Sequence, residues 1–164
     1  MLMQINLKKI TFVAVVVIAV VSAIVVGVAY LRPGQPSESD LGFETISKGV
    51  FCGYTHEAYL VVRNENEWVN LWNKVKSVQA AEPPEVDFSS YMVIAVFMGQ
   101  KPTGGHSIEI VKVVEGAGKV TVNVVKNYPP PGTAVPQVLT QPYHIVKVRR
   151  TEKAVVFKVV ANFE

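Results

Sequence analysis

Apolar residues along the chain fall into three patterns, each typical of a different structural element. A run from Ile10 to Leu31, apolar apart from one threonine and one serine, carries no charge. Between residues 64 and 78, apolar side chains recur at the spacing of one helix face. Beyond residue 90, short apolar or alternating runs are separated by glycine and proline, which predicts strands joined by turns.

The first apolar run predicts a membrane anchor. It is long enough to cross the hydrocarbon core as a helix, and Lys8 and Lys9 precede it, whereas Arg32 alone follows before Glu38. We therefore expect a cytoplasmic segment at 1–9, a single transmembrane helix at 10–31, a Pro/Ser/acidic linker at 32–42, and an extracytoplasmic domain at 43–164. The localisation is then the cell membrane, single-pass, with the N-terminus in the cytoplasm.

A cleaved signal peptide is the alternative interpretation of the same run. The small residues Gly27, Val28 and Ala29 could form a cleavage site. The apolar part of a signal peptide is usually shorter than this one, about 7 to 15 residues. This length favours the uncleaved anchor.

One amphipathic helix is predicted after the linker. Asn64 can cap it, and Glu67 three residues later completes the pattern of a capping box. The apolar positions at i, i+3, i+4, i+7 and i+10 are Trp68, Leu71, Trp72, Val75 and Val78. We expect this face, with both tryptophans, to pack against a sheet.

The remaining apolar runs predict a mainly antiparallel sheet. Met92 to Met98 is continuously apolar, as expected for a central strand covered on both faces. Further strands are expected at 43–46, 57–63, 106–115, 119–127, 143–149 and 154–160. The fold class predicted from these patterns is α+β, a mainly antiparallel β-sheet of about six strands with one amphipathic helix.

Two loops interrupt these strands with polar, proline-rich and glycine-rich sequence. Gly99 to Gly105 contains the motif PTGG, and a long proline-rich loop separates Asn127 from Tyr143. If consecutive strands are antiparallel neighbours, both loops open at one end of the sheet. We call the residues gathered there the predicted rim, namely Lys101, Thr103, Gly104, Gly105, His106, Gln141, Tyr143 and His144.

Charge and cysteine content exclude some classes of function. The formal net charge is +3, and no run of lysine or arginine is interleaved with aromatic residues, so binding of nucleic acid is not expected. Cys52 is the single cysteine, which excludes a disulfide within this chain. We expect it to be a buried small hydrophobic side chain.

Two histidines of the predicted rim raise the possibility of a metal site. A catalytic zinc needs three protein ligands, and the sequence has no HExxH, no CxxC and no carboxylate at ligand spacing near His106 or His144. We expect surface histidines at the starts of strands, and no metal, cofactor or catalytic residue. The alternative is a hydrolase-type enzyme that uses His106 and His144 with a metal or with Cys52.

Four sequence segments together resemble the C-terminal domain of the PrcB family, named for an accessory subunit of a cell-surface protease complex. They are KPTGGHSIEI, PPPGTAVPQVLTQPYHIVKV, the WVNLW of the helix, and the VDF before the central strand. The resemblance covers about Phe43 to Val160. An aromatic residue often follows the second glycine in this family, and His106 stands there instead.

The resemblance implies a membrane-anchored, protease-associated accessory or regulatory domain rather than an enzyme. Its partner would be another extracytoplasmic protein, plausibly a protease. The PTGG and T-x-PY elements place the expected contact residues in two segments. These residues are Lys101, Pro102, Thr103, Gly104, Gly105, His106, Thr140, Gln141, Pro142, Tyr143 and His144.

Overall fold

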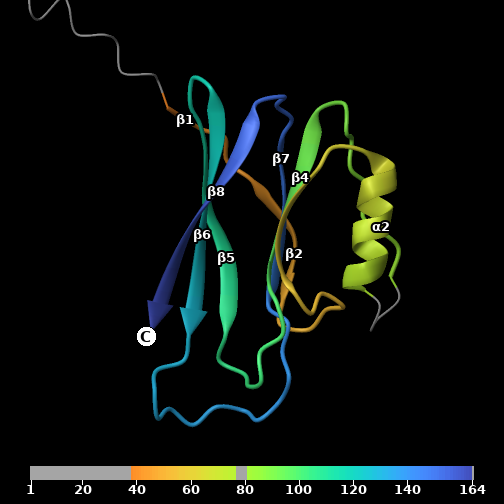
Figure 1. Ribbon diagram of the computed structural model, residues 1–164. Coiled ribbons are helices and arrows are strands. Elements are labelled where there is room, and N and C mark those ends of the chain that lie inside the picture. Colours follow the sequence, from red (N-terminus) through yellow and green to blue (C-terminus); the bar gives the residue numbers. More distant parts are fainter. Residues whose placement is uncertain (1–37, 77–80, 164) are drawn as a thin grey trace, which may run out of the picture. The chain divides into compact units, whose positions relative to one another are not determined.

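The computed structural model describes residues 38–76 and 81–163, which form a β-sandwich with one helix packed on its outer face (Figure 1). One sheet has the strand order β1-β5-β6-β8 and the other β2-β7-β4-β3. The bounds are β1 Ser39–Asp40, β2 Glu44–Gly49, β3 Glu57–Val62, α2 Glu65–Val75, β4 Tyr91–Met98, β5 Ser107–Glu115, β6 Lys119–Tyr128, β7 Tyr143–Arg149 and β8 Ala154–Phe163.

The predicted class is confirmed in its coarse form, since the described residues are mostly antiparallel sheet with one short helix. The prediction of a single sheet is wrong. β4 pairs with β3 and β7, whereas β5 pairs with β6 in the other sheet. One pairing is parallel, between β6 and β8. Ser39 and Asp40, assigned to the linker, form the short strand β1 beside β5.

Strand β4 is buried on both faces, as its sequence predicts. Met92, Ile94, Val96 and Met98 face the other sheet, and the alternate side chains Val93, Ala95 and Phe97 face the helix side. All seven are at most 1% exposed. Two core layers therefore meet on the two sides of a single strand.

Helix α2 covers the second of these layers. Asn64 Oδ1 accepts the backbone N–H of Glu67 at 2.9 Å, which confirms the predicted cap. The Glu67 carboxylate accepts the N–H of Arg63 at 3.4 Å, one residue before the position that a capping box uses. Trp68, Leu71, Trp72 and Val75 are buried against the sheet, as predicted. Val78 lies outside the described residues.

Both indole N–H groups bond to the segment that returns from the helix to β4. Trp68 Nε1 donates to the carbonyl of Pro84 at 2.9 Å, and Trp72 Nε1 donates to that of Ala81 at 2.8 Å. The two rings also contact each other, with centroids 5.1 Å apart. The tryptophan pair is thus core, and its polar atoms are satisfied.

The predicted transmembrane helix at 10–31 lies outside the described residues. Within 38–76 and 81–163 no helix has both the length and the apolar character needed to cross a membrane.

Replacing Trp72 by alanine should lower the free energy of unfolding by about 3–5 kcal/mol, because it removes a buried ring and leaves a cavity. The effect can be measured by chemical denaturation of a fragment covering 38–164. Asn73→Ala, at the exposed neighbouring position, should change stability by less than about 0.5 kcal/mol. Equal effects of the two changes would contradict the core assignment.

Candidate functional site: a loop cluster at one end of the sandwich

Three loops lie together at one end of the sandwich and form the loop cluster, defined as residues 50–56, 99–106 and 129–142. The second loop carries the chain from β4 across to β5 in the other sheet, and the third returns it from β6 to β7. Both crossings occur at the same end, at the bottom of Figure 1. The prediction that these two loops meet is confirmed. The assumed antiparallel pairing of β5 with β6 is also confirmed, whereas the assumed pairings of β4 with β5 and of β6 with β7 are wrong.

Backbone hydrogen bonds hold the two crossing loops together. Lys101 and Thr140 form a reciprocal bridge, with N–H to carbonyl distances of 2.8 and 3.0 Å. The Thr140 hydroxyl donates to the carbonyl of Thr103 at 2.9 Å, and the Gly104 N–H donates to the carbonyl of Pro136 at 2.8 Å. The long proline-rich loop is therefore fixed to the PTGG loop at Pro136 and Thr140.

The loop 50–56 is attached to both of the others. Gln141 N–H donates to the carbonyl of Val50 at 2.7 Å, and Gln100 N–H donates to that of Thr55 at 2.9 Å. Gly99, with a φ of +73°, lies so close to this loop that a Cβ would stand 2.9 Å from the backbone nitrogen of Glu57. Glycine is needed at this exit from β4 both for its φ and for the close approach.

Cys52 contributes to this attachment as a buried residue. Its Sγ lies 3.3 Å from the carbonyl of Gln141, to which the thiol can donate. Burial raises the pKa of the Cys52 thiol, while the backbone hydrogen bond with Tyr54 and the charge of Lys76 act weakly in the opposite direction. A thiol with a raised pKa is a poor nucleophile. The prediction of a buried small side chain is confirmed.

Gly104 and Gly105 differ in role. Gly105 has a φ of +81°, in the region that favours glycine, and it is exposed. Gly104 is buried, and its N–H is bonded to Pro136. Gly105 is therefore the exposed glycine of the pair, and Gly104 holds the proline-rich loop.

Most of the expected contact residues lie in the loop cluster, whereas two lie in strand β7. Tyr143 is 4% exposed, and its hydroxyl is 2.9 Å from the Ser47 Oγ. His144 is 1% exposed and lies between the two sheets. The expectation of a surface histidine at 144 is wrong. Those in the loops are Lys101, Pro102, Thr103, Gly104, Gly105, His106, Thr140, Gln141 and Pro142.

The His144 ring satisfies a backbone group at an irregularity in β5. The register of β5 shifts between Ile110 and Lys112, and the Ile110 N–H donates to His144 Nδ1 at 3.0 Å. An accepting Nδ1 places the proton of the neutral ring on Nε2, which lies 2.9 Å from the Thr45 hydroxyl and donates to it. Both nitrogens are thereby used within the core.

Electrostatics agree with a neutral ring. Burial, followed by the positive charge of Lys48, lowers the pKa of His144 from 6.5 to about 4, against the weaker opposing effect of Glu109. Lys48 and Glu109 themselves form an ion pair of 2.8 Å between the sheets. His144 is thus a structural acceptor and not a free ligand.

His106 has a separate environment in the loop cluster. Its Nδ1 lies 3.2 Å from the carbonyls of both Thr103 and Gly104, so this nitrogen carries a proton and donates. The ring contacts Tyr128 edge-on, with centroids 5.7 Å apart. His144 bonds to Ile110, four residues farther along the chain, or roughly 13 Å of extended strand.

The structure therefore does not bring His106, His144 and Cys52 together. Each bonds to different groups, and no set of three or more metal-ligating side chains is found within residues 38–76 and 81–163. The arrangement gives no support to the alternative hydrolase-type interpretation.

The loop cluster also exposes apolar side chains that are not among the expected contact residues. Phe51 and Leu139 are 57% and 54% exposed, and their neighbours Val50 and Val138 are also exposed. The two pairs approach each other through the hydrogen bond from Gln141 to Val50. We call these four residues the apolar patch. In the sequence, the only sign of this patch is a pair of adjacent apolar residues inside each of the two loops.

Comparison with known proteins finds one family that is similar to the central part of the chain. Residues 92–149 match the family described as PrcB C-terminal. The resemblance expected from the sequence is confirmed over this segment, which runs from β4 through both crossing loops to β7. A search of curated proteins gave no significant match, and neither did a search of solved structures.

The pKa of His144 predicts a specific pH dependence of stability. Between about pH 6.5 and 4 the unfolded histidine is protonated and the folded one is neutral, so acidification favours unfolding. The contribution of neutral His144 to the free energy of unfolding is complete above about pH 6.5. About 2 kcal/mol of it should be lost between pH 7 and pH 5. Unfolding in urea at both pH values measures it.

His144→Asn is the matched control, since its amide oxygen can accept the Ile110 N–H and does not titrate. This variant should lose much less stability over the same pH interval, whatever its stability at pH 7. An equal loss in both proteins would contradict the assigned role of His144.

Proposed function

We propose that this chain is a membrane-anchored, extracytoplasmic binding module, a protease-associated accessory or regulatory subunit that contacts its partner through the loop cluster. The match to the PrcB C-terminal family supports a protease-complex accessory role in general. The observation that carries the proposal is the apolar patch, which is exposed on loops that are themselves fixed by hydrogen bonds.

A fixed apolar patch suits protein recognition for an energetic reason. Binding orders side chains and loops, and this entropy cost reduces affinity. Loops already held by the Lys101–Thr140 bridge and by the Gly104–Pro136 bond lose little freedom when a partner docks. Phe51 and Leu139 can then serve as anchors in pockets of the partner.

The polar groups beside the patch would provide orientation. Lys101 places its ammonium 5.9 Å from the centroid of the Tyr128 ring, and Gln141 Nε2 lies 3.5 Å from Gln100 Oε1. A mixture of apolar anchors with a polar border is the usual composition of a protein interface. No catalytic residue, metal or cofactor is part of the proposal.

Changing the apolar patch should abolish capture of the partner without unfolding the domain. The double variant Phe51→Asp/Leu139→Asp places charges where desolvated contacts are expected, so a crosslinked complex with a protease should be lost from native membranes. Crosslinking, pull-down and identification of the captured protein measure this. The melting temperature should change by only a few degrees, because both side chains are largely exposed.

Val111→Asp is the matched control for that experiment. Val111 is 50% exposed on β5 and lies outside the loop cluster, so capture should be retained. If the double variant captures the same protease as the unmodified chain, the loop cluster is not the interface.

The proposed topology has an independent test. Lys8 and Lys9 flank the apolar run on one side, so a protease added to intact cells should reach residues after 38 and release a fragment of about domain size. Digestion only after lysis would reverse the orientation. Immunoblotting against the folded unit reads out both results.

A further inference from the structure

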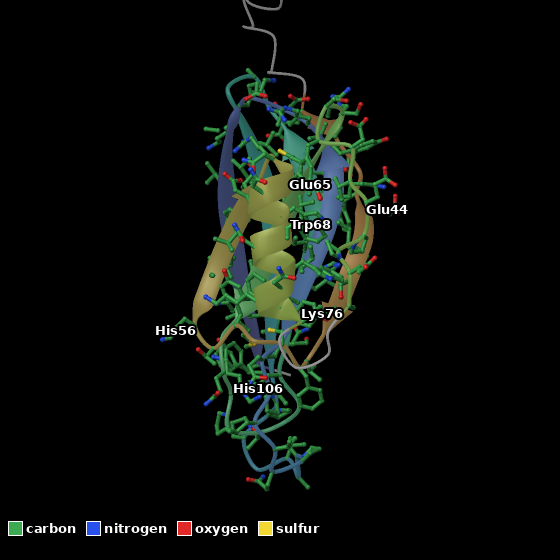
Figure 2. All side chains as sticks on the ribbon, turned by 90° about the vertical axis from the view of Figure 1, so that its right-hand side faces the viewer. Glu44, His56, Glu65, Trp68, Lys76 and His106 are labelled. Carbon is green, nitrogen blue, oxygen red and sulfur yellow. The ribbon has the colours of Figure 1, made fainter. Side chains whose placement is uncertain are left out.

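A groove separates helix α2 from strand β3. None of its lining residues belongs to the apolar patch or to the segment that matches the family, although Tyr54 comes from the loop 50–56. Its volume is about 400 Å³, and on the strand side it is lined by the consecutive residues Leu60, Val61 and Val62. In Figure 2 the helix lies in front of the sheet, with Glu65 at its upper end and Lys76 at its lower end, and β3 rises beside it from His56. Consecutive lining residues mean that the groove follows the edge of the strand.

This edge has backbone groups available for pairing. β3 is the last strand of its sheet and pairs with β4 alone. In a strand, alternate residues direct their N–H and C=O groups to opposite sides, so half of those in β3 point away from β4. Among residues 38–76 and 81–163 no other strand pairs with it. The ligand whose groups repeat at this spacing is an extended peptide.

The floor of the groove is apolar and its two ends differ in charge. Leu71 and Tyr54 contribute to the floor. Glu67 lies at the end near Val62, as its contact with the Arg63 N–H shows. Lys74 lies at the other end, 4.2 Å from the centroid of the Tyr54 ring. A ligand with opposite charges at its two ends would match this field.

We propose that the groove binds an extended peptide segment of a partner protein, which adds to β3 as an antiparallel strand. All other pairings in this sheet are antiparallel, which sets the direction. A central apolar side chain of the peptide lies over Leu71 and Tyr54. A basic residue on its N-terminal side faces Glu67, and an acidic residue on its C-terminal side faces Lys74.

The proposal does not depend on the function assigned to the loop cluster. The groove is built from β3, α2 and Tyr54, and none of its lining residues belongs to the apolar patch. Phe51→Asp/Leu139→Asp should therefore leave peptide binding unchanged. If the experiment at one site gives a negative result, the proposal for the other site is unaffected.

Selection from a displayed library of random ten-residue peptides tests the proposal with the full-length chain in detergent. The expected enriched motif is a basic residue, an apolar residue and an acidic residue in that order. The same selection with Asn70→Trp, which places a ring in the groove from an exposed helix position, should enrich nothing. A motif that survives Asn70→Trp, or no motif with the unmodified chain, overturns the proposal.

The most enriched peptide can then be synthesised with and without methyl groups on alternate backbone nitrogens. Methylation of the amides that face β3 should weaken binding at least tenfold in fluorescence anisotropy, because the strand pairing is lost. Lys74→Glu should weaken binding by about three- to tenfold, and exchanging the acidic residue of the peptide for lysine should restore it. Lys158→Glu, the same charge change on exposed β8, is the matched control and should have no effect. Insensitivity to methylation would rule out strand addition.

Two other occupants would give different results. If the chain dimerises and Asn70→Trp abolishes the dimer, the occupant of the groove is a second copy of the chain. Slow hydrogen exchange of the outward β3 amides in the free monomer would show that another segment of the same chain already covers the edge. Either result contradicts the proposal, which expects a monomer whose outward β3 amides exchange rapidly until the peptide is added.

Discussion

The structure depends on the burial of β4 on both of its faces. A strand whose every side chain from Met92 to Met98 is apolar cannot have a solvated side, so it needs one layer over each face. The sheet that contains β5 and β6 provides one layer, and helix α2 provides the other. The two tryptophans of α2 and the valines of β6 thus pack on opposite faces of the same strand.

This arrangement puts one polar residue where its neighbours are apolar. His144 belongs to β7, beside β4, and its side chain enters the layer between the sheets, where β5 has its irregular register. An unpaired N–H at such an irregularity would cost about 1–3 kcal/mol if left buried, and the neutral imidazole removes that cost. The same hydrogen bonds fix the ring and its proton, which is why this histidine serves packing rather than chemistry.

The sequence predicts the elements of this fold well and their pairing poorly. Local patterns are sufficient for α2, with its Asn64 cap, and for the double burial of β4. Pairing depends on contacts between distant residues, and an apolar strand such as β4 is compatible with neighbours on either side. The assumption that β4 and β5 are adjacent therefore failed, and the parallel contact of β8 with β6 left no local signal.

The candidate site, too, could be predicted from the sequence only in part. That the PTGG loop and the proline-rich loop meet could be predicted, because strand direction alone places their ends together. The burial of Tyr143 and His144 could not, since it depends on which sheet lies opposite β7. The exposure of Phe51 and Leu139 was also hidden, because an apolar residue in a loop gives no sign of whether the fold covers it.

The loop cluster and the groove beside β3 suit different kinds of recognition. In the loop cluster internal bonds such as the Lys101–Thr140 bridge hold the backbone in place, and exposed side chains are available to make contact. At the edge of β3 the backbone itself is available, and side chains of α2 only select what binds. A folded surface suits the first and an extended segment suits the second. The apolar patch lies outside the core around β4, so its residues can change at little cost to the fold, whereas the groove shares Leu71 with that core and can vary freely only at exposed helix positions such as Lys74.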